Sequence, residues 1–386
     1  MVASPASMIP AGAGGSAPAQ GSKGQAPQIL APFTRAAHEH VEPFLDNTIQ
    51  LDGNTHSFGP TSLPAYGYAR SVIVLVTASG GADSGETVAV TADAPWNVIS
   101  QIQLTDVNGA PIFGPFGGYN WMLANLFGGY VFNQAPVNSP LYTAPVVGAS
   151  ASGNFQFMLR IPLEITSRDG LGSLPNQNAA STYKMTYTQA ASTTVYSTPP
   201  DTLPTIRVRA WLEAWTQPDP VDLMGRPQAT VPPAMGTTQF WSEQVNPSVG
   251  SGFQTIQLPR VGNLLRNFIV VTRGSDDSAR TDEFTSGTSL QIQMDGRILL
   301  NEIPEIRKNY QAERFNLGDS AQANLTGVYV YDFTHDLAGK GGEELRDLYI
   351  PTTQATRLEI VGTLTEASQV SILTNDVAPT AEIAVM

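Results

Sequence analysis

Segments from the first half of this chain recur in its second half in the same order, and this duplication constrains the fold more than any other feature of the sequence. Three pairs of segments carry it: Arg70–Thr77 with Arg266–Thr272, Gln101–Leu104 with Gln291–Met294, and Thr48–Leu51 with Thr255–Leu258. In the first pair a basic residue leads into an apolar run that ends in threonine, as expected of a buried strand. Because a repeated order outweighs any single match, we expect two domains of the same topology.

The correspondence continues beyond these segments. The second pair is followed in each half by a turn dipeptide, Asn108-Gly109 or Asp295-Gly296, that favours a hairpin. After each turn comes a set of apolar residues at helical spacing, Trp121, Ala124 and Phe127 in one half and Ile303, Ile306 and Tyr310 in the other, so we expect one helix after the early strands of each half. Two further matches follow: Phe155–Ile165 with Val328–Phe333, and Ile206–Trp215 with Arg357–Leu364.

Apolar and polar residues alternate with a period of two in several segments. In Ile206–Trp215 the apolar positions alternate with Arg207, Arg209 and Glu213, a pattern typical of a strand with one buried face. The 386 residues are 41% hydrophobic and 14% charged, which provides enough apolar side chains for more than one core. The sequence therefore predicts two all-β domains, each a sandwich of sheets.

The chain is acidic and contains few lysines. It has 33 acidic and 20 basic residues, a net charge of −13, and its lysines are Lys23, Lys184, Lys308 and Lys340. Because affinity for nucleic acid grows with the number of phosphates neutralised, direct nucleic-acid binding is not expected. The absence of cysteine excludes disulfides, thiolate metal sites and a cysteine nucleophile. No apolar run reaches the ~20 residues of a membrane-spanning helix, so a soluble protein is expected.

Two segments interrupt the strand pattern. Residues Met1–Gln28 are mainly Ala, Gly, Ser, Pro and Gln, without the apolar stretch of a secretory signal, and are expected to form a flexible arm. Thr34 is expected to cap a short helix over Arg35–Val41, which Pro43 ends. Five prolines between Thr216 and Pro233 predict an interdomain linker. The expected division is an arm with a short helix at 1–45, a first domain at 46–217, a Pro-rich linker at 218–249 and a second domain at 250–386.

Histidines provide no convincing metal site. His38 and His40 flank Glu39, but two residues two apart on a helix point in directions about 200° apart and cannot easily share one ion. A solvated helix is the preferred interpretation of this cluster, since zinc needs three or four converging ligands. His56 and His335 stand alone in the sequence.

Other candidate chemistry is also weak. No serine lies in a Gly-x-Ser-x-Gly elbow, and the glycines Gly114, Gly117 and Gly118 are not followed by the Lys-Ser or Lys-Thr of a phosphate loop. An acidic loop lacks the ligand spacing of a calcium loop and is better explained as solvated: Asp276, Asp277, Asp282 and Glu283. We therefore expect no enzyme activity, no cofactor and no catalytic, cofactor-binding or metal site.

An aromatic set has two interpretations. Trp96, Tyr119, Trp121 and Phe127 would suit a carbohydrate platform if exposed, and core or subunit packing if buried. Packing is the preferred interpretation. The carbohydrate alternative is kept as a two-domain β-sandwich carbohydrate-binding protein, against which the missing secretory signal counts. A glycoside hydrolase is a more distant alternative, because no paired carboxylates are evident at strand ends.

The duplicated pattern resembles a known family of coat proteins. The resemblance is carried by Tyr68–Thr77, by Asn97–Asn108 leading to Trp121, and by Phe155–Leu163 with the following Asp169-Gly170 and Leu174-Pro175-Asn176. These stretches are similar to those of double jelly-roll major capsid proteins, found in tailless internal-membrane phages of the tectivirus kind and in the adenovirus hexon. The similarity extends over residues 34 to 376, with shorter final loops in the second half.

The resemblance implies an all-β fold of two tandem eight-stranded jelly rolls with short helices and an N-terminal arm. It implies a major capsid protein that forms pseudo-hexagonal homotrimeric capsomers of an icosahedral bacteriophage shell. The implied partners are other copies of the chain, neighbouring capsomers, penton and minor capsid proteins, and the internal viral membrane through the arm and helix at Met1–Val41. The implied location is the virion, with assembly in the host cytoplasm.

Overall fold

The computed structural model describes residues 32–128, 136–233, 238–259, 262–274, 279–318, 325–334 and 349–378, all within the compact unit Ala31–Met386. The expected arm, Met1–Gln28, lies outside these residues, as do His335, Asp276 and Asp277. Among the described helices, none is long and apolar enough to cross a membrane.

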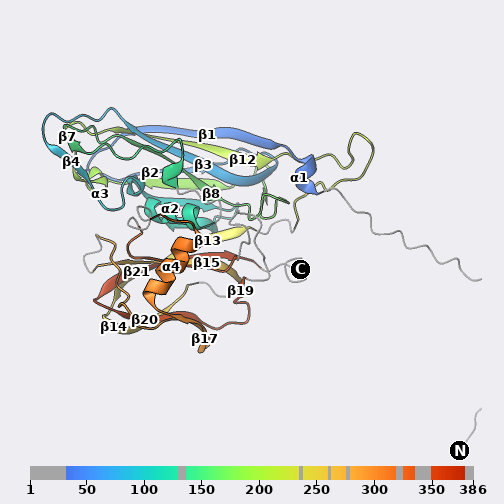
Figure 1. The fold of residues 1–386 in the computed structure, drawn as a ribbon. Coiled ribbons are helices and arrows are strands. Elements are labelled where there is room, and N and C mark those ends of the chain that lie inside the picture. Colours follow the sequence, from blue (N-terminus) through green and yellow to red (C-terminus); the bar gives the residue numbers. More distant parts are fainter. Residues whose placement is uncertain are drawn as a thin grey trace, which may run out of the picture. The chain divides into compact units, whose positions relative to one another are not determined.

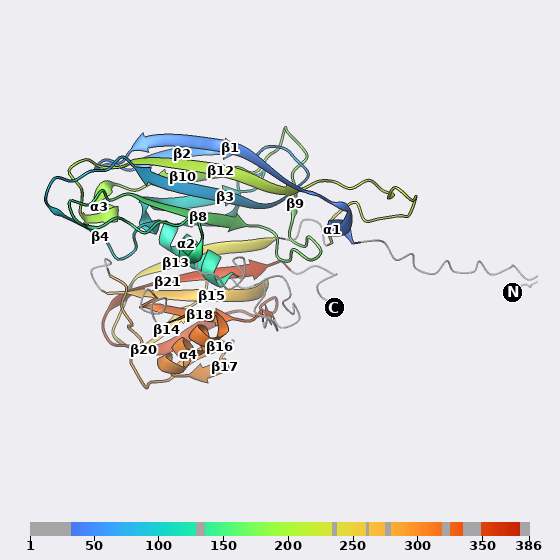
Figure 2. The same cartoon turned by 45° about the horizontal axis from the view of Figure 1, so that its top comes forward.

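The first half of the chain forms a sandwich of two sheets (Figures 1 and 2). One sheet has the strand order β1 (Glu39–Gln50), β12 (Thr205–Trp215), β3 (Tyr68–Ser79) and β8 (Phe155–Pro162). The facing sheet has the order β6 (Pro111–Phe116), β5 (Ile99–Thr105), β10 (Lys184–Gln189) and β2 (His56–Ser62). Neighbouring strands in both sheets are antiparallel.

The second half repeats this arrangement strand by strand. Its first sheet has the order β13 (Gln239–Val249), β21 (Ser368–Val377), β15 (Leu264–Arg273) and β18 (Val328–Asp332). Its facing sheet has the order β17 (Arg297–Glu302), β16 (Leu290–Met294), β20 (Leu358–Leu364) and β14 (Gly252–Gln257). The two halves therefore have the same topology, and the predicted double jelly roll is confirmed.

One helix follows the same hairpin in each half, as predicted. Helix α2 (Gly118–Phe127) comes after β5 and β6, and α4 (Pro304–Arg314) comes after β16 and β17. The hairpins turn at the predicted dipeptides: Gly109, Asp295 and Gly296 all have positive φ. Glycine adopts this conformation freely, which explains why it occupies the second position of both turns.

Short elements complete the described chain. They are α1 (Phe33–Ala36), η1 (Trp96–Val98), η2 (Pro136–Asn138), α3 (Ser192–Val195), β4 (Thr87–Val90), β7 (Gly148–Ala149), β9 (Leu174–Pro175), β11 (Tyr196–Thr198) and β19 (Ile350–Pro351).

Two of the predicted sequence matches are wrong. Thr48–Leu51 lies at the end of β1, whereas Thr255–Leu258 lies in and after β14, the counterpart of β2. Ile206–Trp215 is β12, but its counterpart is β21 and not the strand β20 near Arg357. Both matches rest on short alternating patterns, which recur in any sandwich strand and so do not identify one strand among several.

The predicted helix over Arg35–Val41 is also wrong. Helix α1 is a single turn, Phe33–Ala36, and the chain is already extended in β1 from Glu39. Thr34 does not cap it; its hydroxyl donates a 2.7 Å hydrogen bond to the carbonyl of Arg168. The extended conformation is more stable here because β1 forms a full antiparallel ladder of hydrogen bonds with β12, whereas a short isolated helix is only marginally stable. Pro43 sits at an irregularity of that ladder.

The domain boundaries remain a prediction. Strand β13 begins at Gln239, inside the range 218–249 that the sequence analysis assigned to the linker. We propose that the second domain starts there, because β13 supplies the first strand of the second sandwich.

Candidate functional site: the junction between the two sandwiches

The residues singled out for metal chemistry do not come together. His40 lies in a strand and not in a helix, with its ring stacked 4.0 Å from that of Tyr66. His56 Nε2 lies 2.9 Å from an oxygen of Asp52. No group of three or more His, Asp or Glu side chains that could hold an ion occurs in the described ranges.

The described part of the acidic loop is held by protein contacts. Asp282 accepts a 2.7 Å hydrogen bond from the backbone amide of Gly327 and lies 2.8 Å from Lys308 Nζ. Burial lowers the pKa of Lys308, although the charge of Asp282 opposes this effect. Asp282 therefore acts as the partner of a half-buried lysine of α4.

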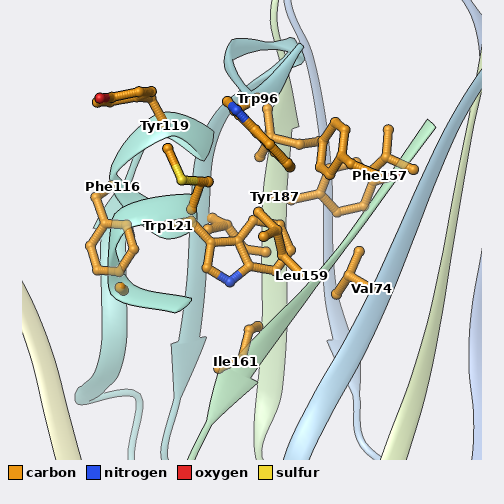
Figure 3. Close-up of a cluster of buried hydrophobic side chains, with 14 of the residues drawn as sticks. Val74, Trp96, Phe116, Tyr119, Trp121, Phe157, Leu159, Ile161 and Tyr187 are labelled. Atoms are coloured by element: carbon orange, nitrogen blue, oxygen red, sulfur yellow. The ribbon is translucent and has the colours of Figure 1, made fainter. Parts of the chain in front are cut away.

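The aromatic set is part of the hydrophobic core (Figure 3). Trp96, Tyr119, Trp121 and Phe127 are each at most 5% exposed. The Nε1 of Trp121 donates a 2.6 Å hydrogen bond to the carbonyl of Arg160, which satisfies the one polar atom of this buried ring. These side chains form no exposed platform for stacking on sugars, so the packing interpretation holds.

Helix α2 joins the two sandwiches. It lies between β8 and the sheet that contains β13 and β15 (Figures 1 and 2), and nearly all its residues are buried. The hydrophobic cluster of the first sandwich extends onto the second through Ile269, Val271 and Leu373. Strand β15 is consequently buried on both faces, because Phe268 and Val270 point into the core of the second sandwich. Because side chains of β15 belong to the cores of both sandwiches, this strand holds the two sandwiches together.

The junction also contains a strand contact. Strands β6 and β13 are paired in parallel at Phe113 and Trp241, so one sheet of each sandwich merges into a nine-stranded sheet. Trp241 is 1% exposed.

A buried polar network surrounds Trp241. The Oε1 of Gln239 accepts hydrogen bonds from Trp241 Nε1 at 3.0 Å, from Asn375 Nδ2 at 2.8 Å and from Arg266 at 3.2 Å. Arg266 also donates to the carbonyl of Gly128, at the end of α2. Because unpaired buried polar groups are costly, this network favours a single arrangement of the two sandwiches.

The start of β13 is tied to the first sandwich. Thr238 donates to the carbonyl of Leu163 at 3.0 Å, and Gln239 Nε2 donates to the carbonyl of Glu164 at 2.8 Å. Burial raises the pKa of Glu164, and the adjacent Arg70 guanidinium, 2.9 Å away, opposes this rise.

An ion-pair cluster closes the other part of the junction. Asp93 of the first sandwich lies 2.5 Å from Arg273 and 2.8 Å from Arg280, both from the second. The guanidinium of Arg280 is also 4.3 Å from the ring centre of Tyr119. All three charged side chains are at most 14% exposed, so one carboxylate offsets part of the charge of two guanidiniums away from water.

Sequence reasoning did not identify the residues that close the sheet edges. On β8, Asn125 of α2 accepts from the amide of Arg160 and donates to its carbonyl, both at 2.8 Å. On β18, Gln311 of α4 accepts from the amide of Val330 at 3.2 Å. The only signal for these residues in the sequence was the presence of a side-chain amide in each predicted helix. Covered edges do not template further strands.

Comparisons with known proteins give the same fold and no sequence relative. No protein-family model and no curated protein matches the sequence. The structure is similar to the STIV MCP, with a TM-score of 0.61 and 12% identity over 90% of this chain and 99% of that chain. A chain from the atomic structure of Sulfolobus Turreted Icosahedral Virus gives a TM-score of 0.60, with 12% identity over 90% and 95% of the two chains. The major capsid protein P2 from Bacteriophage PM2 gives 0.51, with 12% identity over 89% and 99%.

Proposed function

We propose that this chain is the major capsid protein of an icosahedral virus and that three copies form a pseudo-hexagonal capsomer. The supporting observation is the duplicated sandwich. Each chain supplies two sandwiches of the same strand order, and the nine-stranded sheet and α2 hold them in a fixed relative position. Three such chains supply six similar blocks, which is what a hexagonal tile requires.

The likeness to coat proteins supports the same proposal. Two of the similar structures are named as a major capsid protein or as part of an icosahedral virus, and the likeness extends over nearly the whole of both chains. The buried junction also suits a structural role, since its charged and aromatic groups are used to join the sandwiches. We therefore propose a non-enzymatic protein located in the virion shell and assembled in the host cytoplasm.

The proposed partners are other copies of the chain, neighbouring capsomers, penton proteins and minor capsid proteins. The arm at Met1–Gln28 would extend from the capsomer to neighbouring subunits or to an internal viral membrane. This part of the proposal rests on the composition of the arm and on the resemblance described above.

The mass of the purified protein tests the proposed capsomer. With a chain of 41.1 kDa, light scattering should give three times that value, about 123 kDa. Electron microscopy of virus particles whose main protein is this chain should show a hexagonal surface lattice. A monomer at every concentration, or particles without such a lattice, would contradict the proposal.

Deletion of Met1–Gln28 tests the role of the arm separately. We expect the shortened protein to fold and to form trimers, but to assemble into fewer shells. A shell yield equal to that of the full chain would refute the assembly role and leave the capsomer proposal intact.

A further inference from the structure

Helix α4 has an exposed face that contains two large apolar residues. Ile306 is 43% exposed and Tyr310 is 54% exposed. They are four residues apart and therefore lie on one face of the helix. Both belong to the apolar set whose spacing predicted a helix, and an apolar stripe of this kind normally packs against a partner. Glu305, Asn309 and Glu313 are the other exposed residues of this helix.

The corresponding face of α2 is buried. The two helices can be aligned through the strand residues that they contact. Arg160 of β8 is paired with Ile73, and Val330 of β18 is paired with the equivalent Ile269, so Arg160 and Val330 occupy equivalent positions. Each accepts hydrogen bonds at its carbonyl: Arg160 from Trp121, and Val330 from Arg307 at 3.3 Å. Trp121 thus corresponds to Arg307.

With that alignment the exposed apolar residues of α4 have known counterparts. Ile306 corresponds to Asn120, and Tyr310 corresponds to Ala124. In α2 both counterparts are at most 9% exposed, and Asn120 donates a 2.7 Å hydrogen bond to Glu243 on the second sandwich. The face that α2 buries against a neighbouring sandwich is therefore the face that α4 leaves exposed.

The surface that receives α2 also has a counterpart. In the second sandwich it is the outer face of β13, β21 and β15, where Leu373 is paired with Ile269. In the first sandwich the equivalent pair is Trp211 and Ile73, on the outer face of β12 and β3. Trp211 and Ile73 are only partly buried, whereas Leu373 and Ile269 are both fully buried.

The next strand extends this apolar surface. On β1, Pro43 is paired with Trp211 and Val41 with Glu213, so both lie on the same outer face. Pro43 is exposed and Val41 is 53% exposed. The equivalent of Pro43 on β13 is Glu243, which is in contact with α2. The equivalent of Val41 is Trp241, which is paired with β6.

Charges on the two surfaces are complementary. The exposed face of α4 carries Glu305 and Glu313 beside its apolar pair. The outer face of β1, β12 and β8 carries Arg207, Arg209 and Arg160 with two carboxylates, Asp46 ion-paired with Arg207 and Glu213 ion-paired with Arg160, so that one net positive charge remains among these five residues. Opposite charges around an apolar centre favour one docking orientation over others.

The strand edges are complementary in the same way. Strand β6 is paired with β13 within the chain. Strand β17 of the second sandwich corresponds to β6, and strand β1 of the first sandwich corresponds to β13. Among the described strands, β17 and β1 each have a neighbour on one side only. Each of these edges has an exposed apolar residue, Ile298 on β17 and Val41 on β1.

We propose that α4 and β17 of one copy dock on the outer face and edge of β1, β12 and β3 of a second copy, repeating between chains the junction that α2 and β6 make within one. The contact joins two different surfaces, so repetition produces a ring where the rotation between copies closes. The closure of this ring at three copies rests on the proposed function. Ile306 and Tyr310 would then contact Pro43, Trp211 and Ile73 of the next copy.

Cysteine cross-linking tests this contact directly, because the chain has no cysteine of its own. A variant with Val41→Cys and Ile298→Cys is treated with a short bismaleimide and separated on a denaturing gel. In a closed ring each copy is linked to two neighbours, so we expect covalent dimers and trimers with nothing larger. The matched control combines Val41→Cys with Phe253→Cys.

Phe253 is 73% exposed and lies on β14, at the opposite edge of the four-stranded sheet from β17. Three strand spacings, about 14 Å, separate these edges, which a short linker does not span. Trimers by light scattering without covalent products, or with equal products in the control, would overturn the docking inference while leaving the proposed capsomer intact. A monomer at all concentrations would overturn both.

Charge substitution on α4 gives a second test. Ile306→Asp with Tyr310→Asp should keep the circular dichroism of the parent and shift its mass from trimer to monomer, because association is weakened and the trimer dissociates at concentrations at least tenfold higher than those at which the parent dissociates. Phe253→Asp, at an even more exposed apolar site, should leave the trimer unchanged. A folded double variant that remains trimeric at the same concentration would contradict the inference.

Discussion

Asn125 and Gln311 perform the same task in the two sandwiches: each places a side-chain amide from the inserted helix on the backbone of the last strand of a sheet. The amide takes the place of a further strand, and the edge is closed without extending the sheet. Both helices make this contact although they differ in sequence and in burial.

Asn125→Ala should therefore destabilise the first sandwich. The substitution leaves the amide of Arg160 without its partner, and an unpaired buried group costs about 1–3 kcal/mol. Chemical denaturation should show this loss in the free energy of unfolding. Asn309→Ala, which removes only an exposed hydrogen bond to Glu313, should change it by less than about 0.5 kcal/mol. Equal effects from the two substitutions would contradict the edge-closing role.

The sequence predicted the duplication where long apolar runs and turns coincide. Arg70–Thr77 and Arg266–Thr272 do occupy equivalent strands, as do the strands before Asn108-Gly109 and Asp295-Gly296. A buried strand followed by a turn that requires positive φ is specific in both composition and position. Short alternating segments are not, which is why the match of Thr48–Leu51 was wrong.

The junction could not be predicted because its contacts join residues far apart in the chain. Asp93 and Arg280 are separated by 187 residues, and neither stands in a motif. The helix expected at Arg35–Val41 failed for a similar reason, since the partner that makes Glu39 extended is Trp215. By contrast, burial of Trp121 and Phe127 followed from their helical spacing and aromatic character.

Asp93→Asn should destabilise the junction strongly. It removes the carboxylate that Arg273 and Arg280 share, and breaking a buried ion pair in this way costs about 3–5 kcal/mol. Thermal or chemical denaturation measures the loss. Asp46→Asn is the control, because Asp46 and Arg207 are each about half exposed, and such pairs contribute about 0–1 kcal/mol. A loss no larger than that of the control would show that the cluster does not hold the sandwiches together.

Removing the charge of Glu243 should stabilise the protein at neutral pH. Burial raises the pKa of Glu243, while hydrogen bonds from Ser371 and Asn120 and the charge of Arg273 oppose this rise. A carboxyl whose pKa is higher in the folded state binds its proton more tightly there. Its contribution to stability is therefore full below the unfolded pKa of about 4.3 and is lost as pH rises through the folded pKa.

Glu243→Gln keeps the side-chain oxygen that accepts a hydrogen bond from Asn120, but it has no carboxyl that loses a proton as pH rises. Unfolding measured at several pH values above about 4 should show a smaller decline in stability with rising pH for the variant than for the parent protein. Glu42→Gln, at a side chain 42% exposed, is the matched control for the loss of one carboxylate at the surface. If Glu243→Gln instead lowers stability at neutral pH, attraction between Glu243 and Arg273 outweighs the desolvation of the carboxylate, and the prediction is wrong.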